Sequence, residues 1–265
     1  MRGRIDPQLD TDWAAHWRQL VEGRIAVLGG RGEDYWDIRA PVFRAATPGG
    51  PGPFMDVLEP YLAPTRTLID VGAGYGRFAV PLAGRLDWVT AVEPSAGMRE
   101  GIPHVDNMTV VASSWEEAEV QPADLVICVH VLYPITDPVS FLEKMERAAT
   151  ERVFVVLRDA RLTHPAEAMA GEAVPREPWL RDAFCLLRSM GVTPDVTYWR
   201  WQSVHRYPTM EDAVRDCRSQ LGPLWDEARG HAFLEANLRR QADGTLAYEV
   251  GAALNGVLHW RPRKR

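Results

Sequence analysis

Cysteine is scarce in this sequence, and its spacing fits neither a metal site nor a disulfide framework. Three cysteines occur among 265 residues, at Cys128, Cys185 and Cys217. Small secreted proteins depend on paired cysteines, so this scarcity favours a reducing compartment. The first ten residues also lack the apolar run of a signal peptide. We therefore expect a cytoplasmic protein without a structural metal.

Long apolar runs and an excess of basic residues are also missing. The longest apolar stretch, residues 125–135, is too short to span a bilayer and contains His130. The formal net charge is −6 and the isoelectric point is about 5.7, which disfavours a broad surface that binds polyanions. The basic segment at residues 261–265 is the exception, and we interpret it as a solvated terminus. We expect neither a membrane nor a nucleic acid as partner.

A glycine-rich turn after an apolar run is the strongest feature that the sequence does contain. Residues 67–71 predict a buried strand, and Gly72, Gly74 and Gly76 follow it at alternate positions. Such glycines let the backbone turn sharply and approach a ligand, and the next helix begins with free N–H groups. Asp70 stands two positions before the first glycine.

A second apolar run ends in Glu93, which lies 21 positions after Gly72. This is close to the spacing of about 20 at which an acidic residue binds the ribose hydroxyls of a nucleoside. A dinucleotide site would need a glycine or alanine where Arg77 stands. Asp70 would repel a pyrophosphate but suits the ammonium group of a methionine moiety. The pattern thus favours S-adenosylmethionine over a dinucleotide.

Strand and helix patterns alternate regularly through the middle of the chain. This alternation predicts an α/β fold, a Rossmann-like doubly wound sheet that is mostly parallel, with an antiparallel last strand. We expect strands at 67–72, 88–93, 108–113, 123–131, 152–158 and 196–205, and a last strand at 256–260. Expected helices are 11–28, 34–43, 54–62, 76–85, 96–101, a short one near 116–119, 138–149, 178–190, 209–220 and 223–241.

Three further segments determine the predicted organisation of the chain. A linker rich in proline and glycine at 47–53 separates a helical N-terminal lid, residues 1–50, from a core at 51–265. Residues 160–177 contain Pro165 and Pro175, are followed directly by Pro178, and predict a loop. A helical insertion at about 206–245 precedes the last strand, and we expect it to cover the substrate site together with the lid.

The segment from Asp70 to about Asp159 resembles the core of class I S-adenosylmethionine-dependent methyltransferases, in particular the small-molecule branch with ubiquinone/menaquinone-type and natural-product enzymes. The resemblance rests on the glycine turn at 70–76, the second-strand motif at 91–98, the third-strand end at 112–117 and the fourth strand at 123–133. It covers about a third of the chain and says little about the substrate.

The resemblance implies S-adenosylmethionine as cofactor and S-adenosylhomocysteine as product. It assigns cofactor contacts, with Met98 against the adenine and the third-strand end at the adenine edge. The expected cofactor-binding residues are Asp70, Gly72, Ala73, Gly74, Gly76, Glu93, Pro94, Met98, Ser114, Trp115, Glu116, Val129 and His130. In similar enzymes a segment like that around Trp36 folds over the methionine end, where Arg39 would pair with the carboxylate.

Methyl transfer needs a general base only if the acceptor enters protonated. His130, at the end of the fourth strand, is the first candidate because histidine titrates near neutrality. Its alternative is a structural role. Tyr133 would orient the acceptor, and His164 would face it from the loop unless it is simply exposed there. His205 is a weaker candidate. Asp159 has no acidic companions, so we expect no magnesium site.

These observations predict transfer of a methyl group to an oxygen, nitrogen or carbon atom of a small molecule. An RNA or protein methyltransferase is one alternative, and it would need a basic groove beside the site. A non-catalytic protein that binds S-adenosylmethionine is the other. The tryptophan-rich terminal helices fit a lid or the interface of a homodimer equally well.

Overall fold

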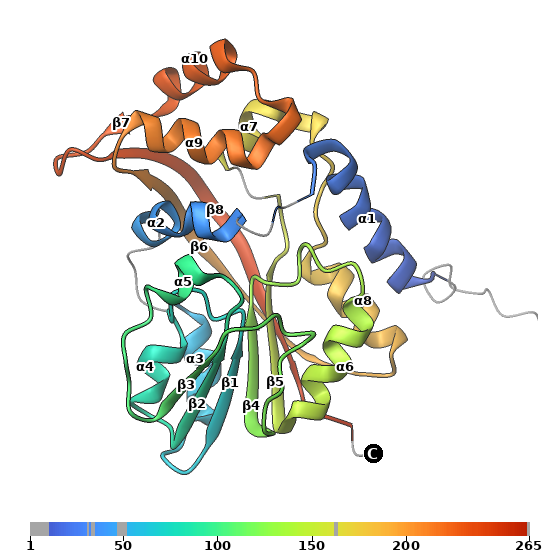
Figure 1. Cartoon of the computed structure of the whole chain (residues 1–265). Helices are drawn as coiled ribbons and strands as arrows, with labels where there is room; N and C mark the ends of the chain where they lie inside the picture. The colour runs from blue at the N-terminus through green and yellow to red at the C-terminus, as the bar shows by residue number, and fades with distance from the viewer. Residues whose placement is uncertain (1–10, 31, 33–34, 47–51, 162–163, 264–265) are drawn as a thin grey trace, which may run out of the picture.

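A twisted sheet forms the centre of the molecule, and the described residues contribute eight strands to it (Figure 1). The computed structural model describes residues 11–30, 32, 35–46, 52–161 and 164–263. The strands are β1 (Thr67–Val71), β2 (Trp88–Val92), β3 (Met108–Val111), β4 (Ala123–Val129), β5 (Ala149–Arg158), β6 (Asp195–Tyr207), β7 (Arg239–Arg240) and β8 (Leu246–Trp260).

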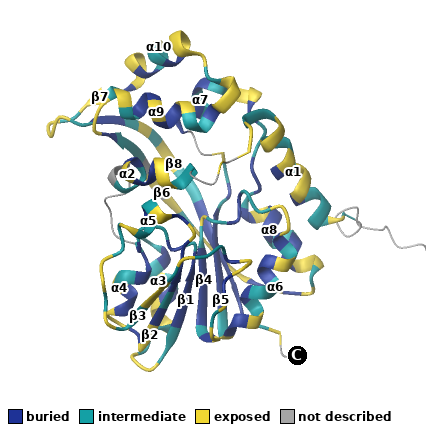
Figure 2. Ribbon diagram, in the orientation of Figure 1, coloured by how far each residue is buried: buried dark blue, intermediate teal, exposed yellow. Residues whose placement is uncertain are grey.

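The strand order is β3-β2-β1-β4-β5-β8-β6, with β7 paired to β8. The first five strands in this order are parallel, and β8 runs antiparallel between β5 and β6. Strands β1 and β4 are apolar along nearly their whole length and buried, as strands covered on both faces must be (Figure 2). The order reverses between β1 and β4, which is where open sheets of this kind bind ligands.

Helices cover both faces of the sheet. One apolar cluster joins the sheet to α1, α6 and α8, and a second joins it to α3 and α4. The helices are α1 (Trp13–Leu28), α2 (Tyr35–Ala46), α3 (Phe54–Leu58), α4 (Ala79–Ala83), α5 (Ala96–Arg99), α6 (Pro138–Ala148), α7 (Pro165–Ala170), α8 (Leu180–Ser189), α9 (Met210–Leu221) and α10 (Glu227–Asn237), with 3-10 turns η1 (Glu59–Tyr61), η2 (Gly171–Ala173) and η3 (Gly222–Leu224).

Strands β6 and β8 extend well beyond the rest of the sheet. Strand β5 pairs with β8 only between Trp260 and Asn255, whereas β6 pairs with β8 as far as Leu246. The protruding ends carry α9 and α10, and α2 and α7 lie beside them (Figure 1). We call α2, α7, α9, α10 and the protruding ends of β6 and β8 the roof. It has an apolar cluster of its own, separate from the two clusters on the sheet.

The predicted fold class is confirmed, including the antiparallel last strand and the long helical interruption before it. Four element predictions need correction. Residues 160–177 contain α7 and η2 and are not a loop throughout. The last strand begins at Leu246 and not at Gly256, because it forms the second strand of the roof. Residues 116–119 form a turn without a helix, and the helix predicted at 223–241 is divided into η3 and α10. Most of the predicted linker, residues 47–51, lies outside the described residues.

Candidate cofactor and acceptor site

The glycine turn after β1 fits a backbone that must come close to its neighbours. Gly72 has a φ of +69°, and a Cβ added there would lie 2.4 Å from a methyl carbon of Val131. The N–H groups of Gly72 and Ala73 both donate to the carbonyl of Val92, at 2.8 and 3.0 Å. The turn is thereby fixed to the end of β2, beside the end of β4.

Glu93 follows β2 and faces this turn. Its side chain is buried, and its two carboxylate oxygens accept from the N–H groups of Gly74 at 2.7 Å and Ser95 at 2.9 Å. Burial raises the pKa of Glu93, although both amides act in the opposite direction. A carboxylate has about four acceptor positions, so each oxygen keeps a free lone pair. Two ribose hydroxyls are suitable donors for them.

Asp70 supplies the second buried carboxyl group of the turn. It is 1% exposed, and its Oδ2 has no hydrogen-bond partner within the described part of the chain. Burial raises the pKa of Asp70 to about 7, against the lowering effect of the Ala79 amide. An unpartnered buried oxygen is rare in native proteins and implies a missing donor. The ammonium group of S-adenosylmethionine would supply that donor and its charge, so these residues fit the cofactor.

The other residues that we predict to bind the cofactor lie around α5, at the end of β4 and after β3. Met98 is buried on the short helix α5, which follows Pro94, and Val129 ends β4. Trp115 instead packs its indole into the core against α6, where Nε1 donates to the carbonyl of Phe141 at 3.2 Å. Contact between Trp115 and the cofactor is therefore left to its backbone. Ser114 caps the turn that contains Glu116, whose side chain is exposed.

Aromatic side chains of α2 lie against the glycine turn. The rings of Trp36 and Phe43 meet edge to face at 5.5 Å, and Phe43 meets Tyr75 of the turn in the same way at 6.1 Å. Helix α2, one part of the predicted lid, thus lies against the glycine turn, whereas the lid role and a direct contact of Trp36 with the cofactor stay predictions.

Asp37 attaches α2 to the core beside Glu93. Its carboxylate accepts from the Ser95 hydroxyl at 2.5 Å and from the Gly97 N–H at 2.9 Å. The two backbones approach so closely that a Cβ on Gly97 would lie 2.9 Å from the Cα of Asp37. This contact could not be predicted from the sequence, because nothing in the pattern of either segment refers to the other.

Arg39 lies on the same helix and binds helix α9 of the roof. Its Nη2 lies 2.7 Å from Oδ1 of Asp216 on α9, and both side chains are buried. The pKa of the Asp216 carboxyl is lowered, because His164 and Arg39 together outweigh the effect of burial. The carboxylate partner of Arg39 is therefore inside the protein, and its predicted role at the cofactor carboxylate stays a prediction.

His164 and Tyr207 complete this buried network around Asp216. The His164 Nδ1 accepts from the Ala166 N–H at 3.1 Å, so Nε2 carries the proton and donates to Asp216 at 2.9 Å. The Tyr207 hydroxyl donates to the same carboxylate oxygen at 3.0 Å. The alternative prediction of an exposed loop histidine is wrong, since His164 caps α7 and is buried. The ring of His205 meets that of His164 edge to face at 4.5 Å.

His130 and Tyr133 lie together where β4 ends. The Tyr133 hydroxyl is 2.7 Å from His130 Nδ1 and accepts from the N–H of Arg158 at 2.9 Å. Arg158 lies over the Tyr133 ring at 4.3 Å and forms an ion pair with Glu177. The sequence pattern indicates His130 and Tyr133 but neither Arg158 nor Glu177, because an isolated arginine and glutamate form no motif.

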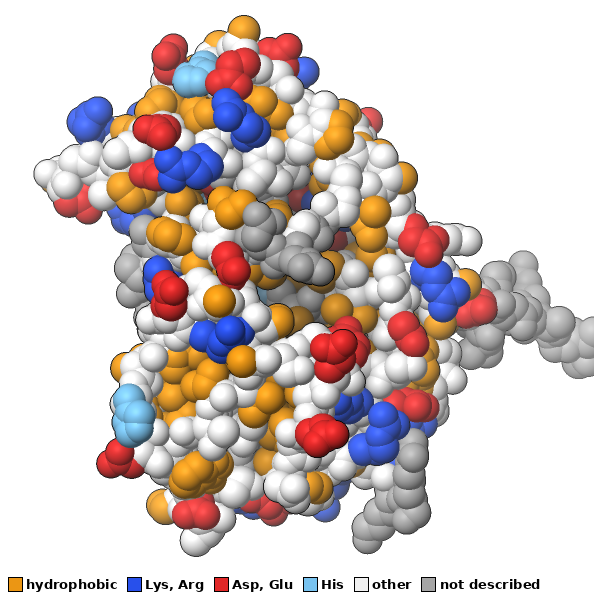
Figure 3. Space-filling model, in the orientation of Figure 1, with side chains coloured by type: hydrophobic (Ala, Val, Ile, Leu, Met, Phe, Trp, Pro, Cys, Tyr) orange, Lys and Arg blue, Asp and Glu red, His pale blue; other side chains and the backbone are white. Residues whose placement is uncertain are grey.

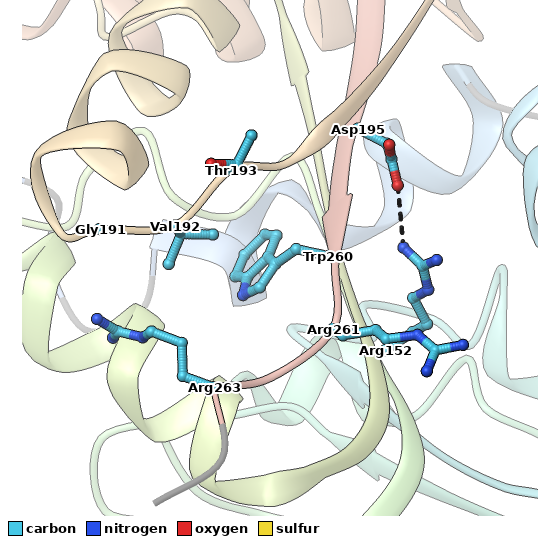
Figure 4. Close-up of a pocket in the computed structure, with 8 residues that line it drawn as sticks. All are labelled: Arg152, Gly191, Val192, Thr193, Asp195, Trp260, Arg261 and Arg263. Carbon is cyan, nitrogen blue, oxygen red and sulfur yellow. Dashed lines mark hydrogen bonds and ion pairs between the residues drawn. The ribbon is translucent and has the colours of Figure 1, made fainter.

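A surface pocket of about 320 Å³ lies at the other end of the sheet, where β5 begins (Figure 4). Two of its arginines form ion pairs within the protein, Arg152 with Asp195 and Arg263 with Glu146. Among the described residues, no cluster of histidine, cysteine and acidic side chains is arranged for a metal ion. None of the described helices combines the length and the apolar character needed to cross a membrane.

Comparison with known proteins agrees with this geometry. The family described as "Methyltransferase domain" matches residues 44–208, more than half of the chain. The chain belongs to this methyltransferase family. The methyl donor of this methyltransferase is S-adenosylmethionine. The glycine turn, Glu93 and Asp70 stay the residues predicted to bind it. No curated protein matches the sequence.

Solved structures share the fold of this methyltransferase at low sequence identity. A protein from Anabaena variabilis, described as a methyltransferase from an antibiotic biosynthesis pathway, has a TM-score of 0.54 at 16% identity and covers 83% of this chain and 98% of its own. One described as a methyltransferase from Bacillus halodurans has a TM-score of 0.52 at 12% identity, covering 88% and 100%. The YcgJ protein from Bacillus subtilis has a TM-score of 0.51 at 15% identity, covering 77% and 96%.

Proposed function

We propose that this methyltransferase acts on a small molecule that binds between the carboxyl ends of the strands and the roof. The bound cofactor would supply an activated methyl group. The protein then has to align donor and acceptor and exclude water, which can contribute roughly 7–11 kcal/mol to catalysis. The observation that carries the proposal is the double attachment of α2, which is fixed to the core through Asp37 and to α9 through Arg39.

Enclosure of this kind favours a small acceptor over a folded macromolecule. We expect a roof held by a buried ion pair to admit only a ligand of limited size, whereas an RNA or protein substrate needs an open groove. Charge supports the same choice. The chain has a net charge of −6, and acidic and basic side chains are interspersed on the face shown in Figure 3. A nucleic-acid surface would be continuously basic.

Compartment and assembly belong to the same proposal. We place the enzyme in the cytoplasm, which fits the free thiols of Cys128, Cys185 and Cys217. The acceptor atom and a homodimer both stay predictions, and sedimentation of the purified protein at several concentrations would test the second.

Calorimetry tests the proposal first. S-adenosylmethionine and S-adenosylhomocysteine should bind with micromolar affinity, and NADH should not bind. Incubation with S-adenosylmethionine labelled at the methyl group should then label small molecules from a fractionated metabolite extract, but not RNA or protein from the same cells. Labelled RNA or protein alone would overturn the small-molecule assignment. Tight cofactor binding without label in any fraction would favour the non-catalytic alternative.

A further inference from the structure

His130 has a backbone conformation that residues other than glycine rarely adopt. Its φ is +60°, the only positive value for a non-glycine residue in the described part of the chain. The His130 N–H donates to the carbonyl of Val156 at 2.9 Å, which holds the residue in place at the end of β4. Such conformations cost about 1–3 kcal/mol and concentrate at functional sites. The backbone of His130 is therefore tightly determined.

Hydrogen bonds around Tyr133 determine which imidazole nitrogen carries the proton. The Tyr133 hydroxyl is buried and accepts from the Arg158 N–H, so its own proton must go elsewhere. The one acceptor that reaches it among the described residues is Nδ1 of His130, at 2.7 Å. A buried hydroxyl without an acceptor costs about 1–3 kcal/mol. Tyr133 therefore donates to Nδ1, and the proton of the neutral ring is on Nε2.

Nε2 is the part of His130 that a ligand can reach. The His130 side chain is exposed, and no described residue binds its Nε2, whereas Tyr133 behind it is buried. Val131, the next residue, contacts the backbone of the glycine turn at Gly72. The free N–H is thus presented at the end of β4, beside the glycine turn.

The charges around this N–H are positive. Desolvation by the surrounding protein, together with the charges of Arg158 and Arg77, lowers the pKa of His130. In the neutral ring Nδ1 accepts from Tyr133 and Nε2 already carries the proton, so no free lone pair faces the acceptor to remove a proton from it. This contradicts the role of general base predicted for His130, but it leaves a hydrogen-bond donor in a positive field.

We propose that His130, fixed by Tyr133, binds an oxygen of the acceptor through Nε2–H, and that the acceptor is a carboxylic acid methylated in its ionised form. This inference rests on the proposed function. A carboxylate has two oxygens, one to receive the methyl group and one to accept the N–H. A phenol or an ammonium group would first have to lose a proton, and His130 cannot take it.

The reaction is balanced without a base. A lone pair of the carboxylate oxygen forms the new O–C bond, while the S–C bond breaks and its electron pair goes to sulfur. The negative charge of the acid and the positive charge of the sulfonium cancel, so the products are a neutral ester and S-adenosylhomocysteine. No proton is transferred at any point, as a site that offers only a hydrogen-bond donor requires.

Nitrogen NMR of the histidine-labelled protein, loaded with S-adenosylhomocysteine, tests the donor role directly. The His130 signals are identified by their loss in His130→Asn, a residue that tolerates positive φ. They should show the Nε2-protonated neutral ring without titration between about pH 5 and 8, where ordinary histidine titrates. In Tyr133→Phe the two neutral forms should mix. A proton on Nδ1, or titration in that range, overturns the inference.

Three simple probes test the acceptor class on the same loaded protein. Benzoate should shift the His130 Nε2 signal, whereas phenol and benzylamine should leave it unchanged. His130→Asn should weaken benzoate binding about tenfold to a hundredfold, as expected for a hydrogen bond to a charged group, and His130→Gln should restore part of it. A shift with benzylamine or phenol but not with benzoate, or no shift with benzoate up to its solubility, overturns the carboxylic acid.

These outcomes are distinguishable from a failure of the proposed function. If wild-type protein binds no S-adenosylmethionine in calorimetry, the methyltransferase site itself is in question. If both wild type and His130→Asn bind the cofactor equally and the NMR result is negative, only the role of His130 and the acceptor class fail.

Discussion

The cofactor cradle and the roof fix a ligand-binding surface by different means. The cradle consists of Asp70, the glycine turn at residues 72–76 and Glu93. In the cradle, Glu93 and the glycine turn are connected through backbone amides, and every partner lies within a short stretch of sequence. In the roof, Asp216 gathers Arg39, His164 and Tyr207 from α2, the start of α7 and β6. The first arrangement needs few particular side chains, and the second consists almost entirely of them.

This difference has energetic consequences. A hydrogen bond to a backbone amide survives most changes elsewhere, because the amide is always present. A buried ion pair depends on both partners, and removal of one leaves an uncompensated charge in the interior. We therefore expect the roof to be more sensitive to single substitutions in stability, and the cradle to be more sensitive in ligand affinity.

The largest effect should follow from Asp216→Ala. Arg39 would then be buried without its counter-charge, and His164 and Tyr207 would each lose an acceptor. Breaking a buried pair in this way typically costs about 3–5 kcal/mol, measurable by chemical denaturation. Glu211→Ala is the matched control, because Glu211 lies on the same helix and its side chain is 82% exposed. Equal stability of the two variants would mean that the network contributes nothing.

A double variant sharpens the test of the roof. Arg39→Met combined with Asp216→Leu removes both charges and keeps approximate volume, so it should recover much of the lost stability. If the double variant is as unstable as Asp216→Ala alone, packing rather than charge holds α2 to α9.

An intermediate effect is expected from Glu93→Ala in the cradle. The ribose hydroxyls would lose a charged acceptor worth about 1.5–3 kcal/mol, which weakens S-adenosylhomocysteine binding by about one to two orders of magnitude. Calorimetry measures it, and Glu100→Ala, an exposed acid just after α5, serves as control. Unchanged affinity would remove Glu93 from the cofactor site. Stability should fall less than in Asp216→Ala.

The same contrast explains how much the sequence could predict. The cradle could be predicted from the sequence because Asp70, Gly72 and Glu93 are fixed by local backbone requirements and a short, regular spacing. The predicted contact of Met98 with the adenine followed from the family resemblance alone. The indole of Trp115, also predicted at the cofactor, packs into the core against α6. The order of strands and helices could be predicted for a similar reason, because strands buried on both faces give mostly apolar runs.

The roof could not be predicted in the same way. Asp216 lies on a polar helix where many acidic residues are exposed, so nothing distinguishes it until α2, α7 and β6 converge on it. The protruding half of β8, from Leu246, lacks the continuous apolar pattern of a central strand because only β6 and β7 pair with it there. His130 was located correctly, but its chemistry depends on where the Tyr133 proton goes, which is a tertiary property.

The smallest effect, and the most specific to the cradle, concerns the pH dependence of cofactor binding. Asp70 titrates near pH 7 in the folded protein and near 3.8 when exposed. Between these values the unfolded chain has released a proton that the folded protein keeps, so the stability of the free protein falls as pH rises. A bound ammonium group favours the ionised carboxylate. S-adenosylhomocysteine should therefore bind more tightly as pH rises toward about 7, by at most about tenfold per pH unit.

Calorimetry in buffers of different ionisation enthalpy would detect the proton that Asp70 releases when the ligand binds near pH 6. Asp70→Asn should abolish that release and flatten the pH dependence, while the free variant should keep its stability up to about pH 7 because the amide does not ionise. Proton release that persists in Asp70→Asn would assign the effect to Glu93, whose pKa burial also raises. In either case the titrating group lies in the cradle, since the pKa of the Asp216 carboxyl is lowered and that group stays ionised throughout this range.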